Sequence, residues 1–334
     1  MKTAEATEPK LSELIALLKR LSPVALAYSG GLDSRFLAFV AKKADVDIHL
    51  YHICGPHISS DETEKAKAWA ISQRIDITCL PINTLLDPGV AENGDERCYF
   101  CKKMLIEAIM EATGVIIGSE RLAAFCPVWK EGLGLPKVLT WQAEEHAKRE
   151  IGPGSLRADV LTPTVCDGNN VSDFEQFRPG MRAMSEYGVW PPLAVCGFTK
   201  DDIRRIAAKI GLDEPSQKAK PCLLTRFAYL LPADEKTLNA LDRAEKRIDE
   251  LLNLAPAEAF TGGVSGKPFL PDFRLRVFGP MEQPGMVELH IQNTVSQDFA
   301  GKLAAEAASF GFAAPAVRLL EKVSGWYDRH RSAP

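Results

Sequence analysis

Six residues near the start of the chain, Ser29-Gly30-Gly31-Leu32-Asp33-Ser34, combine backbone freedom, hydroxyl groups and one carboxylate. Two adjacent glycines let a chain turn tightly and approach a ligand without a Cβ atom in the way. A helix that begins directly after such a turn presents unpaired N–H donors and a partial positive charge. Together these features favour a phosphate site, in which Ser29 and Ser34 add hydroxyl donors.

Asp33 places a further requirement on this phosphate site. A carboxylate beside phosphates must cap the helix or hold a metal ion that bridges them, and we therefore expect Mg²⁺. The segment has neither the spacing of a Walker motif nor that of a dinucleotide fingerprint. The alternative is an ordinary strand-to-helix turn capped by Asp33. Arg35, which follows, is electrostatically compatible with a phosphate at the first turn of the helix.

Three of the eight cysteines have neighbours that favour chemistry. Cys98 and Cys101 form a C-x-x-C between Arg97 and Lys102, where nearby cations stabilise thiolates. Such a pair fits a shared metal or cluster, half of a zinc site, a redox pair or chance. Cys222 is flanked by Lys220 and Arg226, and three thiolates could hold three irons of a [4Fe–4S] cluster. The remaining cysteines are expected to be packing residues, namely Cys54, Cys79, Cys126, Cys166 and Cys196.

The elements that must position these residues alternate between short apolar runs and amphipathic stretches. This alternation predicts βαβ units and a parallel sheet, and hence an α/β fold. The predicted strands are Val24 to Tyr28, Asp47 to Ile53, Ile77 to Ile82 and Val160 to Cys166. The predicted helices are Leu11 to Leu21, Phe36 to Ala44, Asp61 to Arg74, Lys102 to Ala112 and Lys200 to Ile210.

The pattern changes after Cys222. A long charged helix, two alternating strands, another helix and a last strand predict a small α+β domain. They span Ala233 to Leu254, Phe273 to Phe278, Met286 to Gln292, Gln297 to Phe310 and Val317 to Leu320. We therefore predict two domains, residues 1–227 and residues 228–334. Residues 119–158 are less regular and are predicted to be an insertion in the first domain.

Composition narrows the class of partner. The chain has 334 residues, of which 46% are hydrophobic and 25% charged, with a net charge of −4. This balance disfavours nucleic acid as a partner and favours a small-molecule substrate. No apolar run approaches the ~20 residues of a membrane span, and the first ten residues lack the apolar core of a signal peptide. We expect a cytoplasmic protein that does not contact a membrane.

The SGGLDS segment, between a strand and a helix, resembles the PP-loop of the ATP pyrophosphatases, which have a HUP-like nucleotide-binding domain. These enzymes cleave ATP between the α- and β-phosphates and adenylate a substrate. Together with further segments, the chain resembles the LarE family of ATP-dependent sulfur transferases. The segments are RCYFCKK, Asp167–Asp173, Phe177–Gly180, Trp190–Leu193, Phe198–Lys200, Cys222–Arg226 and Ser324–Tyr327.

The resemblance implies an activity and a set of site residues. In that family, carboxylates of a pyridinium mononucleotide are adenylated and become thiocarboxylates of a nickel-pincer cofactor. Catalytic roles then fall to Cys222, Asp33 and Arg226. Cys222 either gives up its own sulfur and becomes dehydroalanine or shares a [4Fe–4S] cluster with Cys98 and Cys101, and we favour the cluster. The residues implied for ATP and Mg²⁺ are Ser29, Gly30, Gly31, Asp33, Ser34, Asn170, Asp173 and Arg178.

Some positions depart from the family pattern, and other functions remain open. Asp173 and Arg178 could equally serve as a helix cap and a loop anchor. Asn169 stands where the family has Thr and Ser172 where it has Asp, so a different carboxylate could be the acceptor. The alternatives are a tRNA-thiolating PP-loop enzyme, an ATP-dependent amide-forming synthetase and a nucleotide-binding sensor. The resemblance also implies a homo-oligomer that uses the second domain.

Overall fold

A computed structural model of the chain describes residues 8–115, 163–175, 179–261, 270–324 and 326–329. The predicted insertion, Cys126 and Arg178 lie outside these residues. The chain divides into two compact units, which are described separately. The first comprises Met1–Gly55, Glu62–Ile82 and Cys98–Lys220, and the second comprises Pro56–Asp61, Asn83–Arg97 and Pro221–Pro334.

The first unit is built on a parallel sheet in the order β3-β2-β1-β4, which confirms the predicted α/β fold. Val24 of β1 lies between Ile48 of β2 and Thr164 of β4. Leu26 and Leu50 are fully buried, as expected for strands covered on both faces. The strands are β1 (Val24–Ala27), β2 (Ile48–Cys54), β3 (Ile77–Pro81) and β4 (Thr164–Cys166).

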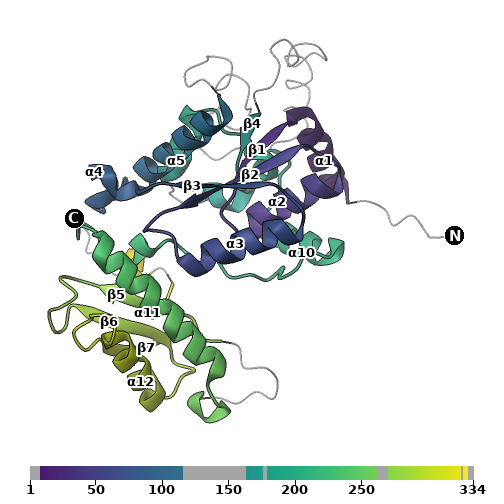
Figure 1. Cartoon of the computed structure of the whole chain (residues 1–334). Helices are drawn as coiled ribbons and strands as arrows, with labels where there is room; N and C mark the ends of the chain where they lie inside the picture. The colour runs from purple at the N-terminus through teal and green to yellow at the C-terminus, as the bar shows by residue number, and fades with distance from the viewer. Residues whose placement is uncertain (1–7, 116–162, 176–178, 262–269, 325, 330–334) are drawn as a thin grey trace. The chain divides into compact units, whose positions relative to one another are not determined.

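Helices cover both faces of this sheet, with α2 and α3 on one face and α5 on the other (Figure 1). Phe36 of α2 and Phe198 are fully buried, and their ring centroids lie 5.6 Å apart. The helices are α1 (Pro9–Leu21), α2 (Leu32–Lys43), α3 (Ser60–Ser72), α5 (Arg97–Thr113), α8 (Pro179–Glu186), α9 (Pro192–Val195) and α10 (Lys200–Ile210).

Local sequence accounts for where α10 begins and ends. The Thr199 side chain accepts from the backbone N–H of Asp202, and the Asp202 carboxylate accepts from the Thr199 N–H, which is a capping box. Gly211 ends the helix with φ +79°, a conformation that glycine adopts without strain. The predicted range of this helix, Lys200 to Ile210, is therefore confirmed.

Helix α5 differs from its prediction. It begins at Arg97 and not at Lys102, so Cys98 and Cys101 lie in its first turn. The side chain of Arg97 is buried and donates to the side chain of Asn93 and to the carbonyl oxygen of Leu224. These long-range contacts fix the helix start, and the local sequence does not reveal them.

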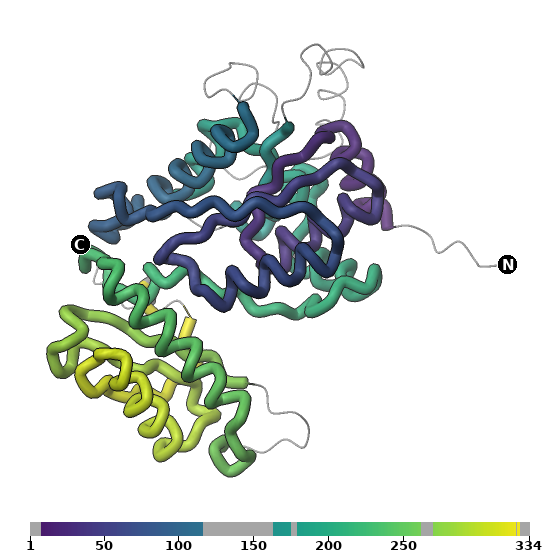
Figure 2. Tube along the Cα trace, in the orientation of Figure 1, coloured from purple at the N-terminus to yellow at the C-terminus, as the bar shows by residue number. Residues whose placement is uncertain are grey.

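The second unit is a small α+β assembly, as predicted. Its sheet has the order β5-β6-β7, with β5 and β6 antiparallel and β6 and β7 parallel. Helices α11 and α12 pack against each other and contact the sheet (Figure 2). The elements are α4 (Pro88–Ala91), α11 (Glu235–Leu254), β5 (Phe273–Val277), β6 (Val287–Gln292), α12 (Gln297–Ala308), β7 (Ala316–Leu320) and α13 (Trp326–Arg329).

The division into units differs from a cut at residue 228. The second unit begins at Pro221 and includes two earlier segments, residues 56–61 and 83–97. Backbone hydrogen bonds hold them there: Leu223 N donates to His57 O at 2.8 Å, and Ala233 N donates to Ala91 O at 2.8 Å. Cys222 consequently belongs to the second unit. Among the described residues, no helix combines the length and apolarity needed to cross a bilayer.

Asp213 contacts two helices of the first unit, α2 through the buried Arg35 and α3 through Trp69. Arg35 of α2 is 4% exposed, and its Nη1 lies 2.9 Å from Asp213 Oδ2. Trp69 Nε1 of α3 donates to the other carboxylate oxygen at 2.8 Å. Arg35 also donates to the backbone oxygens of Asp213 and Glu214. The guanidinium that we considered compatible with phosphate therefore serves to hold the chain after α10.

Replacing Asp213 with alanine should destabilise the first unit. The change removes the anionic partner of a buried guanidinium and the acceptor of the Trp69 indole N–H. We expect a loss of about 1–3 kcal/mol, at the lower end of the range for buried pairs, because the Asp213 side chain is 55% exposed. Urea unfolding of the variant measures it. Asp213→Asn keeps the acceptor and should lose less; equal stability of all three proteins would contradict this account.

Candidate active site

The glycine turn between β1 and α2 has the geometry of an anion site. Gly30 has φ +78°, and a Cβ added there would lie 2.8 Å from the Cβ of Ala66 on α3. No other residue fits this position without strain and a clash. Gly31 precedes the first residue of α2, so the N–H groups of that helix start open toward the turn. The hydroxyl groups of Ser29 and Ser34, which we expect to serve as donors in this site, lie close together, with their Oγ atoms 3.2 Å apart.

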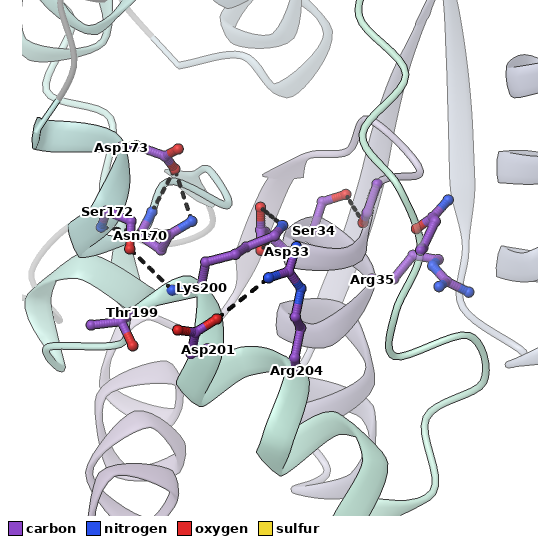
Figure 3. A network of polar contacts seen from close by, with 12 residues as sticks. Asp33, Ser34, Arg35, Asn170, Ser172, Asp173, Thr199, Lys200, Asp201 and Arg204 are labelled. Carbon is purple, nitrogen blue, oxygen red and sulfur yellow. Dashed lines mark hydrogen bonds and ion pairs between the residues drawn. The ribbon is translucent and has the colours of Figure 1, made fainter. Parts of the chain in front are cut away.

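Asp33 is paired with a lysine that the sequence analysis did not select (Figure 3). Lys200 Nζ donates to both carboxylate oxygens of Asp33 at 2.7 Å. The side chains of Lys200 and Asp33 are 29% and 24% exposed, so water and ligands reach the pair. Lys200 is the first residue of α10, and Asp33 lies in the first turn of α2. Two helix N-termini, one cation and one carboxylate thus converge beside the turn.

The loop after β4 completes this side of the site. Asp173 accepts from the backbone N–H of Asn170 at 3.0 Å and from its side-chain amide at 2.9 Å. Asn170 is 1% exposed, and Ser172 Oγ accepts from the backbone N–H of Lys200 at 3.2 Å. The structure therefore brings Asn170 and Asp173 together, in bonds that shape the loop, and ties that loop to α10 (Figure 3).

Asp167 is a buried carboxyl group directly after β4. It is 4% exposed and accepts from the backbone N–H of Asn169 at 3.0 Å and from the Asn169 side chain. Burial raises its pKa to about 7, although the Asn169 N–H and the charge of Lys102 both act to lower it. At Gly168, an added Cβ would lie 3.0 Å from the backbone nitrogen of Ser34. The Asp167 loop therefore packs tightly on the first turn of α2.

Cys98 and Cys101 lie three residues apart in the first turn of α5, where this spacing puts both thiols on one helix face. Cys98 is exposed and Cys101 is partly buried. Gly180 at the start of α8 packs on this turn, since an added Cβ would lie 2.8 Å from Lys102 Cγ. The pair is thus accessible and close to a lysine whose charge reaches Asp167.

Cys222 precedes a short turn, η3 (Leu223–Arg226), in the second unit, and is partly buried. Arg226 is 4% exposed and forms a buried ion pair with Glu245, with Nη2 and Oε2 2.6 Å apart. Its Nη1 donates to Pro221 O at 2.9 Å and to Cys222 O at 3.3 Å. In this structure the Arg226 guanidinium therefore fixes the backbone around Cys222.

Two further arginines lie on β5 of the same unit. Arg276 is 4% exposed, donates to Thr225 O at 2.7 Å and has a buried Nε without a hydrogen-bond partner. Burial lowers its pKa to about 10. Arg274 pairs with Asp272. The sequence analysis passed over both, because arginines at alternate strand positions are typical of a solvent-facing side, whereas every residue of β5 is buried.

Arg97 makes a hydrogen bond within the second unit. Arg97, the residue before Cys98, donates to the carbonyl oxygen of Leu224, two residues after Cys222, at 3.2 Å. The ring of Tyr229 lies 5.5 Å from the same guanidinium. Among the described residues, no three His, Cys, Asp or Glu side chains gather in an arrangement that would hold a metal ion.

The fold defines an α/β protein with a glycine turn at a strand-to-helix junction, which is the candidate anion site. No family model matches the chain. The chain is 23% identical to the pyridinium-3,5-bisthiocarboxylic acid mononucleotide synthase of Lactiplantibacillus plantarum over 246 residues, 72% of each chain. It is 27% identical to an uncharacterised protein of Synechocystis over 248 residues, 71% of this chain and 73% of the relative. An uncharacterised protein of Methanocaldococcus jannaschii is 26% identical over 223 residues, 67% of this chain and 68% of the relative.

The raised pKa of Asp167 predicts a pH-dependent stability. Because the folded pKa is about 7 and the ordinary value is 3.8, the folded state holds this proton more tightly than the unfolded state. Stability is therefore lost as the pH rises from about 4 to about 7. Asp167→Asn removes the ionisation, so its stability relative to the unchanged protein should increase over this range by a few kcal/mol, at about 1.4 kcal/mol per pKa unit.

Thermal unfolding at pH 5 and pH 8 measures this difference. Asp47→Asn, at an exposed position before β2, is the matched control and should follow the unchanged protein at both pH values. A melting-temperature difference for Asp167→Asn that is the same at pH 5 and pH 8 would show that Asp167 is ionised in the folded state throughout.

Proposed function

We propose that this chain is an ATP-dependent, AMP-forming sulfur transferase that converts a carboxylate of a pyridinium mononucleotide-type molecule into a thiocarboxylate. One observation carries the proposal: a turn built for phosphate occurs in the same chain as a cysteine whose flanking carbonyls are held by buried arginines. The similarity to a synthase of a pyridinium bisthiocarboxylic acid mononucleotide supports the choice of substrate class.

The first step would use the glycine turn. A carboxylate is a poor electrophile, and attaching AMP to it creates a good leaving group. The substrate oxygen bonds to the α-phosphorus of ATP, the bond between the α-phosphorus and the bridging oxygen breaks, and pyrophosphate leaves with the electron pair. The N–H groups at the start of α2 and the Lys200 ammonium would offset the charge of the phosphates.

Mg²⁺ suits Asp33 by the chemistry of its donor, because carboxylate oxygens are preferred ligands of this ion. Both oxygens of Asp33 now accept from Lys200, so metal binding would require this ion pair to open. Lys200 would then be released toward the phosphates. The pair thus keeps Asp33 neutralised until nucleotide and metal arrive together.

The second step would use Cys222. Its thiolate attacks the acyl carbon, AMP leaves, and a thioester links the substrate to the protein. Loss of the Cα proton of Cys222 to a base then breaks the Cβ–S bond; the sulfur leaves as the thiocarboxylate, and dehydroalanine remains. Arg226 and Glu245 would keep the segment in place during attack, since they fix its carbonyls.

A [4Fe–4S] cluster is the alternative sulfur source, and we favour it. Thiolates are the usual ligands of such a cluster, and Cys98 and Cys101 share one face of α5, where Cys98 is exposed. Cys98, Cys101 and Cys222 would hold three irons, and the cluster would supply a sulfide so that Cys222 keeps its own sulfur.

Anaerobic purification followed by iron and acid-labile sulfide analysis tests the sulfur source. We expect iron and sulfide in the unchanged protein and their loss in Cys98→Ala, with Cys196→Ala as the control. After turnover with ATP and a pyridinium mononucleotide carboxylate, the mass of the protein should be unchanged. A reconstituted protein without iron, whose mass falls by that of H₂S, would replace the cluster with the sacrificial route. If the protein contains no iron, loses no mass and forms no thiocarboxylate, the proposed function is refuted.

Lys200→Met tests the phosphate site separately from sulfur chemistry. The variant keeps the length of the side chain but leaves the charge of Asp33 uncompensated where the triphosphate would bind. We expect the Kd for MgATP to rise at least tenfold, equivalent to about 1.4 kcal/mol. Calorimetric titration measures it. Arg204→Met, on the same helix and paired with Asp201 at 3.4 Å, is the control and should change the Kd little. Equal affinities of the two variants would remove Lys200 from the site.

A further inference from the structure

The backbone around Cys222 is held by side chains from several elements of the second unit. Thr225 Oγ1 donates to Cys222 O at 2.8 Å, and Arg226 Nη1 donates to the same oxygen. The carbonyls of Pro221, Leu224, Thr225 and Arg226 accept, in that order, from Arg226, Arg97, Arg276 and Tyr327. A short surface turn would ordinarily leave such oxygens to water. The bonds from Arg97, Arg276 and Tyr327 fix the turn to other parts of the unit, whereas those from Thr225 and Arg226 lie within the turn itself.

Tyr327 donates a hydrogen bond to the carbonyl oxygen of Arg226, the last residue of this turn. Its hydroxyl lies 2.9 Å from Arg226 O and 3.1 Å from Val277 O, so one O–H group joins the turn to the end of β5. The Arg276 guanidinium lies 5.0 Å from the ring centroid, and the Phe278 ring packs edge-on at 5.8 Å. Arg276, which donates to Thr225 O, and Tyr327, which donates to Arg226 O, therefore support each other.

The helix α13 that carries Tyr327 is anchored independently of the turn. The Trp326 ring lies edge-on to His290, with centroids 4.5 Å apart. His290 is fully buried on β6, and its Nε2 lies 2.7 Å from Glu288, which also pairs with Arg318. Because Trp326 rests on the middle strand of the sheet, the position of the Tyr327 hydroxyl is set by the fold of the unit.

We propose that Tyr327 is a positioning residue for Cys222: its hydroxyl holds the Leu223–Arg226 turn so that the thiol stays partly buried and presents one direction of attack. The proposal rests on the function proposed above, in which Cys222 handles the transferred sulfur. Tyr327 does not touch the thiol; it acts through the carbonyl of Arg226 and through Arg276. The two hydrogen bonds of the Tyr327 hydroxyl, to Arg226 O and Val277 O, form a clamp that should hold with equal strength from pH 6 to pH 9.

This pH range follows from the groups that face Tyr327. Burial raises the pKa of its hydroxyl above the ordinary value of 10, which keeps it a donor. Burial also lowers the pKa of His290 to about 4, so this ring stays neutral, and Arg276, with a pKa of about 10, stays charged. Arg97 and Glu288 contribute fixed charges nearby. Tyr327, His290 and Arg276 therefore keep their charge states over most of the range from pH 6 to pH 9.

Tyr327→Phe tests the proposal, because it removes only the oxygen. Alkylation by iodoacetamide under native conditions, in protein freed of iron by a chelator and kept reduced, gives the rates of Cys222 and of exposed Cys98 in the same sample by peptide mass spectrometry. We expect the Cys222 rate to rise at least threefold, with the Cys98 rate unchanged. Tyr187→Phe, which removes a hydroxyl bonded to Glu107 in the first unit, is the matched control and should alter neither rate.

Two further measurements separate positioning from general stability. Hydrogen exchange should accelerate at the amides of Phe227 and Ala228, which bond Leu224 O and Val277 O. In turnover, kcat should fall severalfold while the KM for ATP stays unchanged. An unaltered Cys222 alkylation rate in a folded Tyr327→Phe protein would overturn the proposal, even if its melting temperature drops. Because alkylation needs neither ATP nor acceptor, this result stands whether or not the protein transfers sulfur.

Discussion

At Gly30 the chain takes a left-handed turn against α3, at a place where a Cβ atom would lie 2.8 Å from that of Ala66. This contact determines how closely β1, α2 and α3 approach one another, and it directs the N–H groups of α2 toward the turn. Gly168 repeats the constraint from β4, where a side chain would clash with the backbone of Ser34. Close backbone packing on both sides of the α2 start thus shapes the candidate anion site, and the surrounding polar residues are arranged around it.

The two units differ in how far their ion pairs are exposed to solvent. In the first, the Asp33–Lys200 pair is partly exposed, so this ion pair can open at modest cost. In the second, the Arg226–Glu245 pair is 5% and 13% exposed, and the guanidinium is also bonded to backbone oxygens. Breaking that pair would leave a buried charge, which costs several kcal/mol. The exposed pair suits ligand exchange, whereas the buried pair suits the permanent positioning of Cys222.

Much of this arrangement could be predicted from local sequence. The apolar run before Gly30 and the capping residues Thr199 and Gly211 act over a few residues, so the strand, the turn and α10 were predicted correctly. The start of α5 depends on a contact with the distant residue Leu224. The assignment of residues 56–61 and 83–97 to the second unit depends on distant contacts such as that of His57. Sequence spacing reveals neither. Lys200 and Arg276 were missed as site residues because each looks solvated in sequence; the fold places one beside Asp33 and buries the other.

The central claim is that the glycine turn directs ATP to activate a carboxylate. Its most direct test is ³¹P NMR of the nucleotide products formed by the whole chain with MgATP, with and without a pyridinium mononucleotide that carries ring carboxylates. The account predicts AMP and pyrophosphate, formed only when the carboxylate is present. Formation of ADP and phosphate, or cleavage of ATP that does not depend on the carboxylate, would contradict it.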